Sequence, residues 1–309
     1  MVELPMNSSR TVLPPVSTTG VISAPTAVSA SLLVVSFYWT YRRVMVELAR
    51  DWWYDDNYSH GFLIVPLALY FAWESRDQLR TAVVRPSVVG LLGLAGAVGL
   101  LVAGVLGAEL FLSRVSLVAS LASIIVFVCG WTTLRILMFP VGFLLLMVPI
   151  PAIVFNQIAF PLQLFASRAG ELTLATLRVP VLREGNVIVL ATTTLEVAEA
   201  CSGIRSLISL LTLGIVLGHV ADQRTWARVV IALATIPVAI VANGLRIAGT
   251  GVAAAYIGPQ AAEGFFHTFS GWLVFVFAFA ILFAIQRTIA WLVPGGPERA
   301  LASSEVPAR

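Results

Sequence analysis

Lysine is absent from this chain of 309 residues, cysteine occurs only twice, and charged residues make up only 11% of the sequence. The nineteen basic residues are therefore all arginines, and they are scattered between apolar runs. A nucleic-acid-binding surface would need a basic stripe, so this scatter argues against one. Two cysteines cannot form a disulfide framework. So little charge also excludes an ordinary soluble domain.

Apolar residues are abundant instead. They make up 59% of the sequence, and the mean hydropathy is +0.93. This composition predicts a polytopic membrane protein. Residues 1–20 are polar and rich in Pro, Ser and Thr, without the basic start and apolar core of a cleaved signal peptide. We expect a disordered cytoplasmic tail over residues 1–20, a transmembrane domain over 21–290 and a cytoplasmic C-terminal tail over 291–309.

Apolar runs that can cross a bilayer predict an all-α fold with about eight transmembrane helices. They lie at about residues 21–40, 60–73, 88–108, 111–130, 134–148, 201–220, 229–247 and 265–285. The long outward segment before the sixth run has two parts. Residues 152–178 have apolar side chains at helical spacing, which predicts a helix that lies in the membrane interface or re-enters the bilayer. Residues 179–197 alternate and hold a Glu-Gly-Asn turn, which predicts a small β-hairpin.

Arginine placement predicts the orientation of these helices, because short cytoplasmic loops carry an excess of positive charge. Arginines follow the second, fourth, sixth and eighth runs, at Arg76, Arg80, Arg85, Arg135, Arg224, Arg228, Arg287 and Arg299. We therefore expect these loops and both chain ends in the cytoplasm. Arg42, Arg43 and Arg50, which follow the first run, oppose this orientation.

Cys201 lies where a polar loop becomes the sixth apolar run, with Arg205 one turn further on. A helix N-terminus and a nearby cation both favour the thiolate form of a cysteine, so Cys201 is the candidate nucleophile. Two alternatives stay open: a membrane cysteine is often only a small packing residue, and Arg205 can extend toward the lipid head groups. Cys129, among Val, Phe and Trp, fits the packing interpretation.

Three reactive residue types are predicted to meet at the outer surface. The chain crosses inward from Cys201 and returns, which brings Asn243 and Arg246 to that surface, where His267 begins the eighth run. A cysteine nucleophile, a histidine acid or base, and an arginine that holds an oxyanion or a carboxylate are the parts of thiol acyl transfer. Asn243 and Arg246 share a helix face. The alternative for Arg246 and for His267 is an ordinary residue of the membrane interface.

The other two histidines are weaker candidates. His60, at the start of the second run, either joins the site or caps and supports that segment, and His219 is interpreted as an interfacial residue. The chain has no Gly-x-Ser-Gly, His-Glu-x-x-His or Gly-x-Gly-Asp motif, which argues against serine, zinc and aspartate intramembrane proteases. We expect no metal site, because one cysteine and one histidine at a common depth leave too few ligands.

Four motifs follow one another along the chain. They are Trp-Trp-Tyr-Asp-Asp-Asn-Tyr-Ser-His-Gly-Phe-Leu-Ile-Val-Pro at 52–66, Glu-Ala-Cys-Ser-Gly-Ile-Arg-Ser at 199–206, Asn-Gly-Leu-Arg at 243–246 and His-Thr-Phe-Ser-Gly-Trp at 267–272. In this order and spacing they resemble the exosortases, the bacterial members of the exosortase/archaeosortase group. The resemblance extends from about Trp52 to Trp291. It is to the exosortase A type, without the fused C-terminal periplasmic domain that some members carry.

The resemblance implies an eight-span enzyme of the bacterial inner membrane whose active site faces the periplasm. Its catalytic residues would be Cys201, Arg246 and His267, and the residues that bind substrate or support the site would be Arg205, Asn243, His60 and Glu199. The implied substrates are secreted proteins with a C-terminal Pro-Glu-Pro motif, a transmembrane helix and a basic tail. They would be cleaved near that motif and, by analogy with sortases, transferred to another envelope component. The expected partners are these substrates and the lipid bilayer, with no cofactor and no nucleic acid.

A transporter or a scaffold of polysaccharide export is the alternative function, because members of the family often accompany exopolysaccharide biosynthesis genes. Either would explain the apolar runs equally well. Transport would predict ionisable groups near the bilayer midplane. The polar residues of this chain instead gather at the predicted outer boundary, which favours the enzyme.

Overall fold

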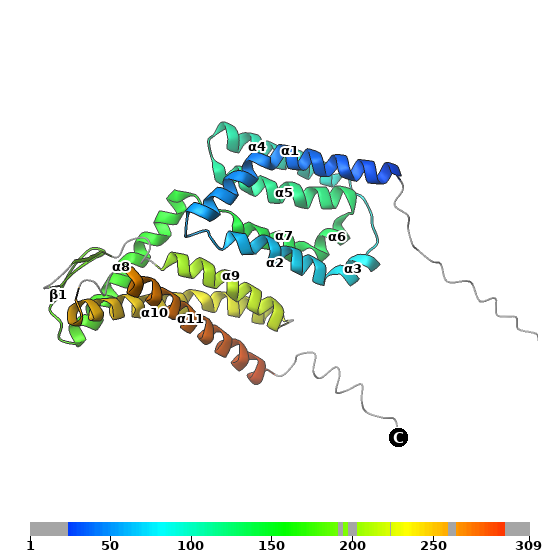
Figure 1. Cartoon of the computed structure of the whole chain (residues 1–309). Coiled ribbons are helices and arrows are strands. Elements are labelled where there is room, and N and C mark those ends of the chain that lie inside the picture. Colours follow the sequence, from blue (N-terminus) through cyan, green and yellow to red (C-terminus); the bar gives the residue numbers. More distant parts are fainter. Residues whose placement is uncertain (1–23, 191–193, 197–202, 223, 259–263, 294–309) are drawn as a thin grey trace, which may run out of the picture. The chain divides into compact units, whose positions relative to one another are not determined.

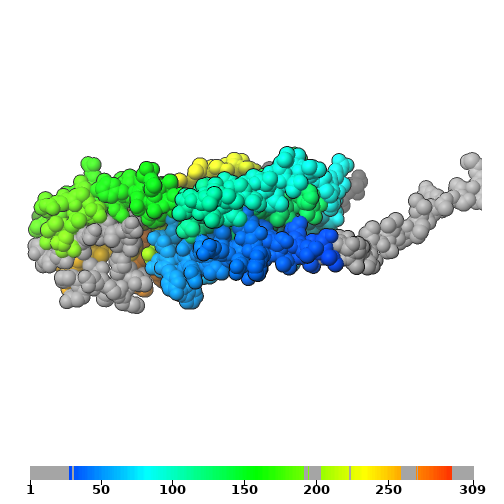
Figure 2. Space-filling model, turned by 90° about the horizontal axis from the view of Figure 1, so that it is seen from above, coloured from blue at the N-terminus to red at the C-terminus, as the bar shows by residue number. Residues whose placement is uncertain are grey.

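The computed structural model describes residues 24–190, 194–196, 203–222, 224–258 and 264–293, and the remaining residues are drawn in grey in Figures 1 and 2. The expected tail over residues 1–20, and most of the tail over 291–309, therefore lie outside the described residues. The chain divides into two compact units, Met1–Met45 and Val46–Arg309. Helix α1 (Ala24–Tyr54) begins in the first unit. All of the motif residues belong to the second unit, which is described here.

Helices make up most of the second unit. After α1 they are α2 (Gly61–Glu74), α3 (Arg76–Thr81), α4 (Val89–Leu106), α5 (Leu110–Val128), α6 (Trp131–Ile136), α7 (Met138–Phe143), the 3-10 helix η1 (Leu144–Met147), α8 (Ala152–Thr176), α9 (Ile204–Ala221), α10 (Thr225–Tyr256) and α11 (Gly264–Leu292). The strands β1 (Val181–Glu184), β2 (Val187–Leu190) and β3 (Thr194–Glu196) form an antiparallel sheet in the order β1-β2-β3. The predicted helix and hairpin ahead of α9 are confirmed, and a third strand joins the hairpin.

Five of the described helices are long and apolar enough to cross a membrane. They are α4, α5, α9, α10 and the part of α11 from Gly271 to Leu292. A sixth span results if Met138–Met147 and Ala152–Thr176, which meet at an angle of 77°, form one broken span. Helix α2 has 14 residues, fewer than the roughly 20 that a bilayer requires. The described residues therefore show a polytopic membrane protein with five or six candidate spans, and the count of eight stays a prediction.

Two helices differ from the sequence prediction. Helix α1 does not end near residue 40 but continues to Tyr54, so most of the expected 41–59 loop is helical. The apolar run expected to form one span at 134–148 is divided among α6, α7 and η1, and the chain then bends by 77° into α8. Pro149 and Pro151 lie at this bend. Proline lacks a backbone N–H and disfavours helical conformation in the residue before it, so the two prolines account for the break.

Helices α9, α10 and α11 pack against one another, as Figure 1 shows. Their shared core includes Leu210, Ala242 and Leu282. Helix α10 has 32 residues and is about 48 Å long, which exceeds the roughly 30 Å apolar thickness of a bilayer. It continues past the predicted end at residue 247 because Ile247 and Ala254 are buried against residues of α8 and β2. The sheet and the end of α8 therefore pack against the C-terminal part of α10.

Candidate functional site

A glycine holds the start of α9 against α10. Gly203, the residue before α9, has a φ of +79°, a left-handed conformation that favours glycine. A Cβ on Gly203 would lie 2.7 Å from Cγ of Asn243, which is far too close. The motif of residues 199–206 therefore meets the motif of residues 243–246 through a contact that only glycine permits. Cys201 and Glu199, which precede Gly203, lie outside the described residues.

Arg246 connects α10 to α11. Its guanidinium lies against Gly271, where a Cβ would be 3.5 Å from Cζ, an ordinary contact distance. His267 precedes Gly271 by four residues in α11, so the two positions lie on the same face of the helix, one turn apart. The side chain of His267 is not among the described parts of the chain. The helix turn that carries His267 and the Arg246 guanidinium are nevertheless neighbours.

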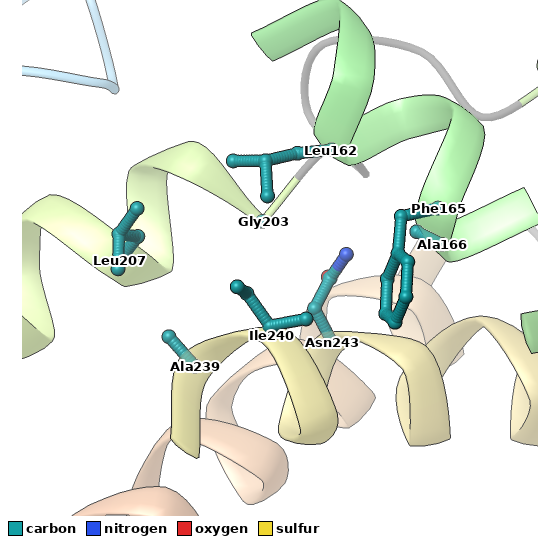
Figure 3. Close-up of a pocket in the computed structure, with 8 residues that line it drawn as sticks. All are labelled: Leu162, Phe165, Ala166, Gly203, Leu207, Ala239, Ile240 and Asn243. Atoms are coloured by element: carbon teal, nitrogen blue, oxygen red, sulfur yellow. The ribbon is translucent and has the colours of Figure 1, made fainter. Parts of the chain in front are cut away.

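A small pocket opens beside these contacts, between α8, α9 and α10 (Figure 3). It is lined by Leu162, Phe165, Ala166, Gly203, Leu207, Ala239, Ile240 and Asn243. Its lining is apolar apart from the glycine backbone and Asn243, whose amide points from α10 toward the gap between α8 and the start of α9 in Figure 3. The space inside it is about the size of one water molecule, so a substrate side chain could enter only if the lining residues moved.

Arg205 is paired with a carboxylate of the first motif. Its Nη1 lies 3.2 Å from Oδ2 of Asp56, and its Nε donates a hydrogen bond of 3.4 Å to Oδ1 of Asn57. The sequence predicted Arg205 to act as a cation that favours a thiolate at Cys201. Because Asp56 balances the charge of Arg205, that electrostatic support is weaker than the sequence alone indicates.

His60 contacts the backbone at the bend before α8. Its Nε2 lies 3.2 Å from the carbonyl oxygen of Leu146, which is an acceptor, so Nε2 carries the proton. Burial lowers the pKa of His60, and the carbonyls of Leu146 and Asn57 offset part of this effect. His60 occupies the N-cap position of α2, but its side chain makes no hydrogen bond that caps the helix. A neutral ring that donates to a backbone carbonyl is a structural support.

Two neighbours of His60 bond the same stretch of chain. Trp52 Nε1 donates to the Met147 carbonyl at 3.0 Å, and the N–H of Ile150 donates to the Tyr58 hydroxyl at 3.2 Å. Burial raises the pKa of Tyr58, so its hydroxyl stays protonated. The backbone at the bend has lost its helical partners, and such groups need substitutes in an apolar environment. The motif of residues 52–66 supplies them.

Sequence reasoning missed several residues of this site. Gly203 and Gly271 make the contacts between motifs, and Phe165 forms a wall of the pocket. The glycines stand inside the motifs, which is a signal of close approach, whereas nothing local in the sequence distinguishes Phe165. Within the described ranges, no group of three or more His, Cys, Asp or Glu side chains is arranged to hold a metal ion.

The fold and these contacts define a multi-pass helical membrane protein in which the motifs of α9, α10 and α11 meet. The model of the transmembrane exosortase family matches residues 52–284, which includes all four motifs. The chain therefore belongs to the exosortase family, a group of membrane sorting enzymes. No curated protein and no solved structure gives a significant match to it.

Proposed function

We propose that this protein is a cysteine peptidase or transpeptidase-like sorting enzyme that cleaves C-terminal Pro-Glu-Pro signals of secreted proteins. Its proposed place is the bacterial inner membrane, with the site facing the periplasm, and its proposed role is in envelope or exopolysaccharide biogenesis. The observation that supports this proposal best is the pair of contacts Gly203–Asn243 and Arg246–Gly271. They place the three motifs of α9, α10 and α11 at one location.

Cys201 is the proposed nucleophile. Only Ser202 separates it from Gly203 in the chain, so the Cα atoms of Cys201 and Gly203 are at most about 7 Å apart. The Cys201 sulfur forms a bond to the scissile carbonyl carbon, the peptide C–N bond breaks, and His267 gives a proton to the leaving amine. His267 then takes a proton from water or from an acceptor amine, which displaces the sulfur and releases the product.

Arg246 is the proposed partner of the negative charge that develops during this reaction. A fixed guanidinium stabilises an oxyanion strongly in a site that excludes water. Asn243, whose amide points toward the gap between α8 and the start of α9, would bond the substrate backbone. Glu199, Arg205 and His60 have supporting roles in this proposal.

Replacing each cysteine in turn tests the proposal. The assay follows removal of a C-terminal Pro-Glu-Pro signal, with its apolar helix and basic tail, from a secreted reporter in cells. Cys201→Ala should abolish processing, whereas Cys129→Ala should process normally, because Cys129 is a free thiol at the far end of α5. If the signal is still removed by Cys201→Ala, the nucleophile assignment is wrong and the transporter or scaffold becomes the better hypothesis.

A further inference from the structure

The segment from Asp51 to Gly61, called here the 51–61 segment, is attached to the molecule on two sides. Trp52, Tyr58 and His60 attach it to the backbone of residues 146–150, as described above. Arg205 attaches it to α9, because one guanidinium contacts both Asp56 and Asn57. The 51–61 segment therefore connects the bend before α8 with the first turn of α9.

Apolar contacts also connect the 51–61 segment with α8 and the start of α9. Tyr58 of the 51–61 segment is buried in a cluster with Phe155 and Ala159 of α8 and with Ile204, the first residue of α9. Trp52 packs against this cluster as well. Arg205 directly follows Ile204, so its ion pair lies at the edge of the buried cluster. The ion pair and the cluster restrain the same turn of α9.

The positive charge of Arg205 lies in the first turn of α9 and is compensated by the carboxylate of Asp56. The first turn of a helix disfavours a cation, because the N-terminal end of the helix dipole is positive. The carboxylate of Asp56 compensates for this, at 3.2 Å from the guanidinium. The pair is partly exposed, with 75% of the Asp56 side chain and 39% of the Arg205 side chain accessible. Its energetic contribution is therefore modest, and its value lies in fixing geometry.

We propose that Arg205 is a positioning residue that holds the 51–61 segment over the start of α9 through Asp56 and Asn57, and that it acts neither on the Cys201 thiol nor on the substrate. This inference rests on the proposed function, since the helix start that is positioned follows the proposed nucleophile. It assigns to Arg205 a structural partner that lies in another motif of the chain.

A cycle of neutral variants tests the proposal with the processing assay in cells. Arg205→Gln removes the contacts with both Asp56 and Asn57, whereas Asp56→Asn removes only the ion pair. Each should lower the processing rate by about two- to fivefold, the range that an exposed ion pair supports, with the larger loss for Arg205→Gln. The double variant should be no slower than Arg205→Gln, because that variant already removes the ion pair. Asp77→Asn is the matched control, since Asp77 is 73% exposed and lies 3.7 Å from Arg80 on α3, away from the motifs. It should process normally.

The pH dependence of Cys201 alkylation gives a second measurement. It changes if Arg205 acts on the thiol through its charge, and it stays the same if Arg205 only positions the 51–61 segment. In a Cys129→Ala background, the rate at which a thiol reagent alkylates Cys201 is followed as a function of pH. The midpoint of this profile should be the same for Arg205→Gln, for Asp56→Asn and for the parent protein. A cation that acted on the thiol would give a higher midpoint for Arg205→Gln and a lower one for Asp56→Asn.

Three results would overturn the positioning role. They are a loss of about 100-fold or more for Arg205→Gln alone, losses that multiply in the double variant, and a shifted alkylation profile. Cys201→Ala, measured in parallel, reports separately on the proposed function. Processing by Cys201→Ala would refute the nucleophile while leaving the cycle between Arg205 and Asp56 interpretable.

Discussion

Helix α10 carries two arginines that lie toward opposite ends of the α9–α10 pair, Arg228 and Arg246. The residues that contact these two arginines differ. Near the turn that joins α9 to α10, Nη1 of Arg228 lies 3.1 Å from Nδ1 of His219. Nε of Arg228 donates to the Asp222 carbonyl at 2.6 Å. The His219 ring stacks on Phe139, with centroids 3.7 Å apart and 3° between the planes. This arginine and this histidine are held by each other and by an aromatic ring.

At the other end, Asn243 and Arg246 meet their neighbouring helices at glycines. Gly203 faces Asn243 and Gly271 faces Arg246, and the pocket of Figure 3 adjoins the first of these contacts. Asn243 fills the space that a side chain at position 203 would need, whereas a Cβ at position 271 would be in ordinary contact with Arg246. The difference teaches that residue types alone do not distinguish the two ends, whereas the neighbours that hold each arginine do.

Arginine-to-lysine substitution, made separately at Arg246 and at Arg228, should give the largest difference between the two ends. Lysine keeps the charge but loses the planar fork. Arg246→Lys should lower processing of the reporter on the order of 100-fold, because the proposed partner of the oxyanion is lost. Arg228→Lys should stay within about threefold and cost roughly 1 kcal/mol of stability, the usual contribution of a hydrogen bond. Rates are normalised to the amount of folded protein in the membrane. Equal losses for both variants would remove the distinction between the ends.

Gly203 and Gly185, two of the glycines with positive φ, allow the effect of backbone strain to be separated from the effect of the contact with Asn243. Gly203→Ala introduces left-handed strain of about 1–2 kcal/mol and also forces Asn243 to move, because of the 2.7 Å approach. Processing should fall roughly tenfold beyond the level that strain alone produces. Gly185, in the β1–β2 turn, has a φ of +64° with nothing within 4 Å of an added Cβ, so Gly185→Ala is the control for strain. If the two variants process equally well, the Gly203–Asn243 contact has no functional weight.

Much of this arrangement is readable from the sequence, and the parts that are not have physical reasons. The apolar runs predicted α4, α5, α9, α10 and α11, and the Glu-Gly-Asn turn predicted the hairpin, because helical length and turn chemistry are local properties. The run expected as one span at 134–148 ends before Pro149 and Pro151, as predicted, but it is divided among α6, α7 and η1, which hydropathy does not reveal because it treats an apolar run as continuous.

The partners of the polar residues were harder to predict. Arg205 and Asn57 are 148 residues apart in the chain, so no local pattern connects them. Arg205 was interpreted through its nearest chemistry, the thiol of Cys201, and its contact with Asp56 emerged only from the fold. His60 was expected to cap α2 or to join the site, and it bonds the backbone of Leu146, 86 residues further along the chain, a contact that no local pattern predicts.

His60 offers a smaller test, because it lies in the motif of residues 52–66 but, like His219, is held by contacts with other residues of the chain. Its pKa is lowered by burial below the ordinary value of 6.5. As the pH falls through 6.5, the unfolded chain takes up a proton that the folded protein resists, so this contribution to stability is present above 6.5 and is lost toward acid. His60→Gln, which keeps a donor for Leu146, should unfold with a weaker dependence on pH. Thermal unfolding in detergent at pH 7.5 and at pH 5.5 measures this, and an unchanged dependence would refute the assignment.

Gly271→Ala should have the smallest effect, and it tests whether processing requires free space beside Arg246. An added Cβ would lie 3.5 Å from Cζ of Arg246, an ordinary contact that requires no movement. Alanine also favours a helix over glycine by up to about 1 kcal/mol, so the variant should be slightly more stable and should process the reporter within about twofold of the parent. Gly271→Leu, which would displace the guanidinium, should process far less. A loss for Gly271→Ala as large as that for Gly203→Ala would show that the space beside Arg246 is itself required, which places the substrate between α10 and α11 and not in the pocket beside α8.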